Sequence, residues 1–154
     1  MSGTFGGLAG GLAMTRFSRP RLPLDDSSPQ PLQYSVQEWD AASGIAKSVA
    51  RRLTGRGLSP AGTRAGAAIV HYSMAAAGGL AYATLVRPHM AKSVWSGIFF
   101  GTAMWFMGNE LLLPGLGLIA PDHRTLRMRA NALGEHLVYG LAVETTCRRF
   151  DAAR

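Results

Sequence analysis

Residues 65–86 are the feature that most limits what this chain can fold into. Their sequence, AGAAIVHYSMAAAGGLAYATLV, runs for 22 residues without Asp, Glu, Lys or Arg. About 20 apolar residues in a helix, rising ~1.5 Å each, cross a hydrocarbon core of roughly 30 Å. Arg64 and Arg87 stand at the two ends, where the charged anchors of a membrane helix are expected. The segment predicts a transmembrane helix; the alternative is a buried helix of a soluble bundle.

Residues 93–113 have the length of a second span. The segment SVWSGIFFGTAMWFMGNELLL carries one formal charge, Glu110, and is followed by Pro114, which we expect to stop the helix. Gly97 and Gly101 form a GxxxG pattern. Because helices in lipid associate by close packing rather than by the hydrophobic effect, this spacing predicts a helix-packing face.

Residues 130–147, ANALGEHLVYGLAVETTC, form the third long apolar segment. Its Leu, Val, Ala and Gly residues suit a membrane helix, but it also holds Glu135, His136 and Glu144. Ionisable groups are costly in lipid, so we predict a span whose polar groups face other helices. Glu144 precedes Arg148 by one helical turn, and this spacing predicts an interfacial ion pair between them.

The N-terminal segment is a weaker span. Residues 3–15 are apolar and glycine-rich, but they are shorter than the ~17–25 residues of most spans before Arg16 follows. We interpret them as a short or tilted helix. With 47% hydrophobic and 16% charged residues in 154, the chain is apolar for a soluble protein, and one membrane domain over residues 1–154 is expected.

A long polar connection, residues 16–64, separates the first span from the second. Residues 18–33 are rich in Pro and Ser and are expected to be extended, whereas SVQEWDAASGIAKSVARRLTG has helical periodicity. Lys47 and Arg51 lie opposite an apolar stripe. The pattern predicts an amphipathic helix on an anionic membrane surface, or one packed on another protein domain. The stripe consists of Val36, Trp39, Ala46, Val49 and Leu53.

Together these segments predict an all-α fold, a polytopic membrane bundle of about four transmembrane helices plus one amphipathic interfacial helix. The net charge of +7 is distributed unevenly in this topology. One side holds eleven basic residues and the other five, so the first side is expected to be cytoplasmic. The eleven are Arg16, Arg19, Arg21, Lys47, Arg51, Arg52, Arg56, Arg64, Arg124, Arg127 and Arg129; the five are Arg87, Lys92, Arg148, Arg149 and Arg154.

The same topology places five polar residues at one depth in the bundle. Helical rise puts them within roughly 10 Å of one another along the membrane normal, which predicts an intramembrane polar layer. A structural interlock between helices is the favoured interpretation. A proton path or pH sensor, and a metal site, are the alternatives. The layer consists of His71, Asn109, Glu110, Glu135 and His136.

No motif in the sequence indicates an enzyme or a bound cofactor. There is no phosphate-binding glycine loop, nucleophile elbow or zinc-ligand spacing, so no catalytic residue, cofactor or metal is predicted. The single cysteine, Cys147, is expected to be a packing residue. The arginines accompany apolar spans rather than stacking aromatics, so nucleic acid is not an expected partner.

The C-terminal half resembles the YagU-like bacterial inner-membrane proteins. The similarity lies in WSGIFFGTAMWFMGNELLLPGLGL and in ALGEHLVYGLAVETTCRRF, and more weakly in GLAGGLAMTRF and HYSMAAAGGLAYA. It implies a small multi-pass protein of the bacterial plasma membrane without an established activity. Members of that family usually carry basic residues before the first helix, which are missing here, so the orientation could be opposite. The matching positions are Trp95, Gly97, Gly101, Pro114, Leu116, Gly117, Leu118, Gly134, His136, Leu137, Val138, Glu144, Arg148 and Arg149.

Two functions are consistent with these patterns. The favoured one is a non-enzymatic integral membrane protein that supports the envelope or a membrane complex. The alternative is a small channel, transporter-like protein or pH sensor that uses the His and Glu side chains of the polar layer. In either case the expected partners are a bilayer with anionic head groups and a second copy of the chain or another membrane protein.

Overall fold

The structure is a computed structural model that describes residues 2–18, 33–116 and 125–153. Every secondary-structure element in these ranges is a helix, which confirms the predicted all-α fold. Residues 19–32 of the polar connection, with Arg19 and Arg21, lie outside the described residues. So do Gly117, Leu118, Arg124 and Arg154, and the side chains of Val36 and Trp39.

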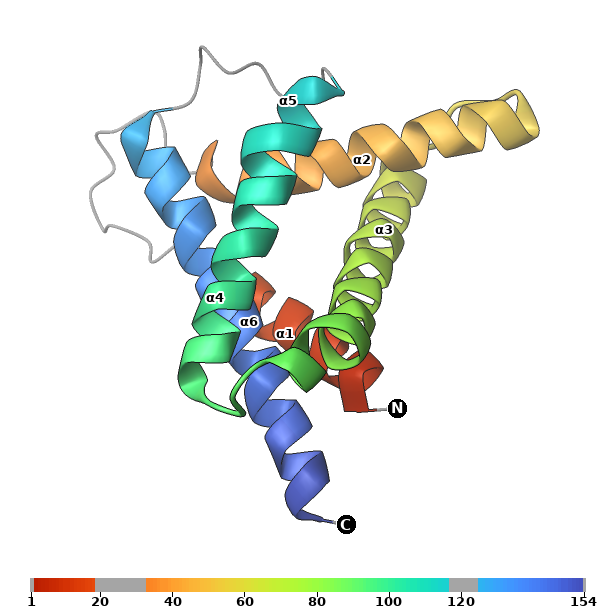
Figure 1. Cartoon of the computed structure of the whole chain (residues 1–154). Helices are drawn as coiled ribbons and strands as arrows, with labels where there is room; N and C mark the ends of the chain where they lie inside the picture. The colour runs from red at the N-terminus through yellow and green to blue at the C-terminus, as the bar shows by residue number, and fades with distance from the viewer. Residues whose placement is uncertain (1, 19–32, 117–124, 154) are drawn as a thin grey trace.

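Four helical rods form the bundle, and neighbours in contact run in opposite directions. They are α1 (Ser2–Phe17), α3 (Pro60–Ala81), α4 (Val94–Trp105) and α6 (Leu126–Ala152). α1 lies against both α3 and α6, and α4 lies against α6. Both chain ends are at one end of the bundle (Figure 1). The direction therefore alternates along the chain, as a four-span topology requires.

α2 (Gln33–Thr54) runs across the end of the bundle opposite to the termini (Figure 1). It packs on α3 through small residues: a Cβ on Gly66 would lie 2.9 Å from the Cβ of Ala46. Lys47 and Arg51 are exposed, as the amphipathic pattern predicts. Only part of the apolar stripe is covered by protein, because Val49 and Leu53 are also exposed.

The start of two helices is fixed by local sequence. The Ser59 hydroxyl accepts a hydrogen bond from the Gly62 amide at 3.1 Å, and Pro60 follows at the first helical position. Thr125 caps α6 by accepting from the Met128 amide. These side chains satisfy amide groups that the first turn leaves without an intrahelical acceptor.

The ends of α3 and α4 are less regular than their starts. α3 continues into the π-helix η1 (Tyr82–Val86) and the 3₁₀ turn η2 (Arg87–His89), and α4 continues into the π-helix η3 (Phe106–Leu112). Pro114 does not stop the helix as predicted. The short α5 (Leu113–Gly115) includes this proline, so the continuous helical run that begins with α4 ends one residue beyond Pro114.

α1 fits between α3 and α6 because its glycines face both helices. Gly3, Gly7 and Gly11 lie against α3, where a Cβ on Gly7 would lie 2.9 Å from the Cα of Ala76. On the other face, a Cβ on Gly10 would lie 2.6 Å from the ring of Tyr139 on α6. Glycine spacing in residues 3–11 therefore sets how closely three helix backbones approach.

The predicted pair Gly97 and Gly101 lies in the contact between α4 and α6. A Cβ on Gly97 would lie 2.7 Å from the carbonyl oxygen of Gly140, and one on Gly101 would overlap the backbone of His136. Gly140 faces both glycines from α6. The contact thus uses glycine from both helices, which the sequence pattern on α4 alone does not reveal.

Aromatic side chains fill the middle of the bundle. The rings of Tyr82 and Phe100 are 4.6 Å apart, and those of Phe100 and Tyr139 are 6.1 Å apart. The outward faces are apolar as well. Exposed side chains on them include Phe5, Leu8 and Leu12 of α1, Ile69, Met74 and Leu80 of α3, and Trp95, Phe99 and Phe106 of α4 and η3.

One continuous helix in the described ranges, Pro60–His89, is long and apolar enough to cross a membrane by length and composition. Only 11% of its most apolar window is buried within the protein. The predicted span 65–86 lies inside it. α1 has 16 residues, so it is longer than the predicted 3–15 but still short for a perpendicular crossing.

Candidate functional site

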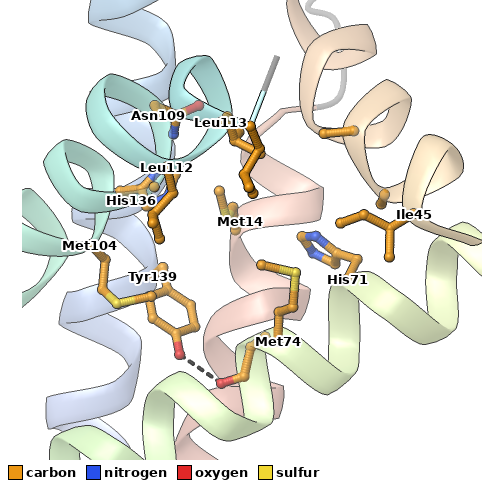
Figure 2. A pocket seen from close by; sticks show the side chains of 15 residues that line it. Met14, Ile45, His71, Met74, Met104, Asn109, Leu112, Leu113, His136 and Tyr139 are labelled. Carbon is orange, nitrogen blue, oxygen red and sulfur yellow. Dashed lines mark hydrogen bonds between the residues drawn. The ribbon is translucent and has the colours of Figure 1, made fainter. Parts of the chain in front are cut away.

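A cavity of about 230 Å³ lies below α2 and is lined by parts of all four rods. Apolar side chains make up most of its wall, to which α2 contributes Ala41, Ala42 and Ile45. Figure 2 shows Ile45 at the edge of the cavity. The remaining lining residues are Met14, His71, Met74, Ala75, Met104, Gly108, Asn109, Leu112, Leu113, Leu116, His136 and Tyr139. The cavity is therefore an apolar space with a few polar groups, the usual composition of a ligand site.

Three of the five predicted polar-layer residues line this cavity. His71 lies on the α3 wall, while Asn109 from η3 and His136 from α6 lie on the opposite wall (Figure 2). The His71 Nε2 is 3.5 Å from the Thr15 hydroxyl oxygen on α1. The His136 Nδ1 is 2.9 Å from the Ala132 carbonyl oxygen, and it donates because a carbonyl can only accept. Three residues of the predicted polar layer thus line the same cavity.

The two glutamates of the predicted layer are not part of the cavity wall. Glu110 turns to the start of α6, where the Arg129 guanidinium binds it through two nitrogens, with Nε 3.2 Å from Oε1. Glu135 is also on α6, where it directly precedes His136, and its side chain is buried. A helix turn presents successive residues about 100° apart, so sharing a depth does not make residues share a face.

A second polar cluster lies at the end of the bundle that holds the termini. The Arg87 Nε is 3.0 Å from Glu144 Oε2, and the Tyr82 hydroxyl donates to the same oxygen at 2.8 Å. Asp151 accepts from Arg87 Nη1 and from Lys92 Nζ, both at 2.9 Å. The Arg87 and Glu144 residues are 8% and 1% exposed. This buried pair connects the end of α3 to the end of α6.

The predicted interfacial pair of Glu144 with Arg148 is wrong. Glu144 faces the bundle interior, whereas Arg148 is exposed. Arg87, expected at the membrane interface, instead points inward. The reason is desolvation, because a carboxylate taken out of water needs a charged partner that is buried with it. Among the described residues, Arg87 is the basic side chain that is buried beside Glu144.

Comparisons of the chain with protein-family models, with curated proteins and with solved structures found no match. The YagU-like resemblance stays a prediction from the quoted motifs.

The structure brings few other reactive groups together. Among residues 2–18, 33–116 and 125–153, no group of three or more His, Cys, Asp or Glu side chains is placed to hold a metal ion. Cys147 is fully buried in the aromatic and aliphatic core between α6 and its neighbours. This position fits the packing role predicted for its thiol.

The sequence patterns did not predict the π-helical turns at the ends of α3 and α4, which position residues of both polar sites. η1 precedes Arg87, and η3 carries Gly108 and Asn109 into the cavity wall. A π-helical turn adds one residue to the repeat, so it rotates the following side chains relative to an α-helix. The signal available in the sequence was the polar residue itself, Asn109, inside an apolar segment.

Asp151 provides a prediction for the effect of pH on stability. Hydrogen bonds from Lys92 and then from Arg87 hold the pKa of this carboxyl below its ordinary value of 3.8. Because the folded pKa is depressed, the stabilisation is complete above that ordinary value and is lost as the pH falls through the folded value. The melting temperature of Asp151→Asn should therefore lie slightly below that of the parent at pH 7.

The measurement is thermal unfolding in detergent for both proteins across the range from pH 7 to pH 3. The difference should be constant well above the ordinary carboxyl pKa of 3.8 and should shrink as the pH falls below that value, through the lowered pKa of folded Asp151. The Asp151 side chain is 36% exposed, and ion pairs in contact with water contribute little to stability. The difference in melting temperature is therefore expected to be small. A difference that grows as the pH falls would contradict the ion pairs with Lys92 and Arg87.

Proposed function

We propose that the protein is a multi-pass integral membrane protein of the plasma membrane, with α1, α3, α4 and α6 as four spans and α2 on the membrane surface. Its role is non-enzymatic: it supports the envelope or a membrane complex through closely packed helices. One observation carries this proposal. The outward faces of the bundle are apolar, while the exposed charges gather at its two ends.

The distribution of charge supports a bilayer around the bundle. Arg16, Lys47, Arg51 and Arg64 are exposed at the α2 end, and Arg148 and Arg149 at the other. A soluble protein of this size rarely exposes contiguous apolar surface over several helices. In a bilayer the same surface contacts lipid chains without cost. The exposed Val49 and Leu53 of α2 would then dip into the surface of the membrane.

The interior favours a structural role over a conducting path. The cavity with His71 and His136 is near the α2 end, and the Arg87–Glu144 pair is near the opposite end. Between them the rings of Tyr82, Phe100 and Tyr139 fill the bundle, and the Tyr139 hydroxyl donates to the Ala75 carbonyl oxygen at 2.6 Å. An ion crossing this layer would lose its hydration without polar replacement.

Cysteine labelling tests the four-span topology directly. Single cysteines replace Gly57, Ala91, Gly115 and Ala153 in a Cys147→Ala background; all four sites are exposed at the ends of the bundle. A maleimide that cannot cross membranes is added to intact cells and to inverted vesicles. Four spans place Gly57→Cys and Gly115→Cys on one side, and Ala91→Cys and Ala153→Cys on the other.

The Gly115 site decides between four spans and one. If only Pro60–His89 crosses the membrane, Gly115→Cys will be labelled from the same side as Ala91→Cys. The α2 side is expected to be cytoplasmic because it is more basic, so Gly57→Cys should react only in inverted vesicles. Labelling of all four sites from one side would refute membrane spanning altogether.

Proton flux in liposomes tests the alternative function as a channel or transporter. The parent and the double variant His71→Ala with His136→Ala are compared with a pH-sensitive dye trapped inside. A structural role predicts the same background leak for both proteins. A flux in the parent that the double variant abolishes, while the variant stays folded, would replace the structural proposal with the conducting one.

A further inference from the structure

The cavity below α2 opens sideways, toward the surface that would contact lipid. Three of its lining residues are also strongly exposed: Met74 on α3 is 59% exposed, and Leu112 on η3 and Leu116 after α5 are 55% and 68% exposed. They stand on opposite sides of the opening, one on α3 and two on the rod that begins with α4 (Figure 2 shows Met74 and Leu112). The cavity therefore has an entrance between these two rods.

The size and lining of the cavity suit a hydrocarbon chain. Its volume of about 230 Å³ is below the roughly 300–1,000 Å³ of sites for compact drug-sized ligands. Methionine side chains from three rods line it: Met14, Met74 and Met104. Methionine adapts its shape to flexible apolar partners, so these walls can close around a chain.

Charge at the α2 end indicates which lipid the chain belongs to. Three elements expose a basic residue at this end of the bundle: Arg16 in the last turn of α1, Lys47 in α2 and Arg64 in α3. Arg64 lies two turns before the lining residue His71 and on the same face of α3. The nearby acidic Glu110 is already bound by Arg129. A cationic rim above an apolar cavity matches an anionic head group above its acyl chain.

We propose that the cavity binds one acyl chain of an anionic phospholipid, which enters between α3 and η3 from the leaflet on the α2 side. The inference rests on the proposed membrane topology. The head group would lie beside Arg64, at the end of the bundle that also exposes Arg16 and Lys47, and the chain would fill the space under Ala41 and Ala42. Bound in this way, the lipid would complete the packing between two rods that the protein itself leaves apart.

Native mass spectrometry of protein from bilayers of equal phosphatidylglycerol and phosphatidylcholine tests the proposal. The parent should retain one phosphatidylglycerol. In Gly108→Leu retention should fall about tenfold or more, because leucine takes the room of several methylene groups. A Cβ on Gly108 meets no atom within 4 Å, so this change fills space without moving the backbone. Ala77→Leu adds the same type of side chain on the exposed outer face of α3 and should retain lipid like the parent.

A second variant tests the head-group contact separately. Arg64→Gln should reduce the preference for phosphatidylglycerol and leave a bound lipid. Equal retention by Gly108→Leu and the parent would overturn the cavity as the site, as would a retained second copy of the chain in place of lipid. Equal retention of the two lipids by the parent would overturn the anionic preference. Cysteine labelling on the same samples reports the topology, so a failure of lipid binding is distinguishable from a failure of membrane spanning.

Discussion

Replacing Gly7 by valine is expected to separate α1 from α3 and to expose Cys147 to thiol reagents. A Cβ on Gly7 would overlap the Ala75 carbonyl oxygen and lie 2.9 Å from the Cα of Ala76. These are backbone atoms of a helix, so they cannot rotate away as a side chain can. Overpacking of this kind costs about 1–3 kcal/mol or more, and here the whole of α1 must move to relieve it.

Cys147 makes the separation measurable. It is the only thiol in the chain and is fully buried in the core that includes Met14 of α1. The rate of maleimide labelling in mild detergent therefore reports how often α1 leaves the bundle. A destabilisation of about 3 kcal/mol corresponds to more than a hundredfold rise in this rate when opening and closing are fast.

Gly44→Val is the matched control for this substitution. Gly44 lies in α2, and a Cβ there would meet no atom within 4 Å. The same change of residue type in a helix should therefore leave the labelling rate of Cys147 close to that of the parent. If both variants label at the same rate, or if Gly7→Val stays protected, α1 does not depend on the close approach to α3.

Replacing Arg87 by methionine is the second change with a large expected effect. The change removes the cation beside Glu144, which is 1% exposed. The Tyr82 hydroxyl then still donates a hydrogen bond to this carboxylate. Removing one member of a buried ion pair typically costs about 3–5 kcal/mol, because the other charge stays desolvated. In detergent, we expect the denaturant concentration at the unfolding midpoint to be clearly lower for Arg87→Met than for the parent.

The double variant Arg87→Met with Glu144→Gln distinguishes a buried charge from lost packing. With both charges removed, most of the lost stability should return, which gives a coupling energy of about 3 kcal/mol in the double-mutant cycle. Arg148→Gln is the control, and this exposed change should stay within about 0.5 kcal/mol of the parent. A cost for Arg148→Gln equal to that of Arg87→Met would restore the pair predicted from the sequence.

Apolar periodicity and local capping residues account for the part of the fold that the sequence predicts. The uncharged run 65–86 lies within Pro60–His89, and the segment with a basic face became the helix α2. Helical structure is decided within a few turns, by propensity, by caps such as Ser59 and by the pattern of apolar residues. Such signals are present in any single sequence.

The candidate site was predictable only in part. Counting the rise per residue grouped His71, Asn109 and His136, and these three residues line one cavity. It could not give the rotation of each helix about its own axis, which turned Glu110 toward Arg129 instead. Two π-helical turns change that rotation along α3 and α4, and the polar residue Asn109 was the one sign of the second turn in the sequence.

The sequence by itself determined that the chain is helical, that its apolar segments alternate with basic ends, and where the main apolar helix lies. Only the tertiary structure decided which glycines meet a backbone, that Arg87 rather than Arg148 binds Glu144, and that a cavity remains below α2. The physical reason is that helix formation depends on neighbours along the chain. Close packing and the desolvation of charge depend on residues that are distant in sequence, 57 positions apart for Arg87 and Glu144.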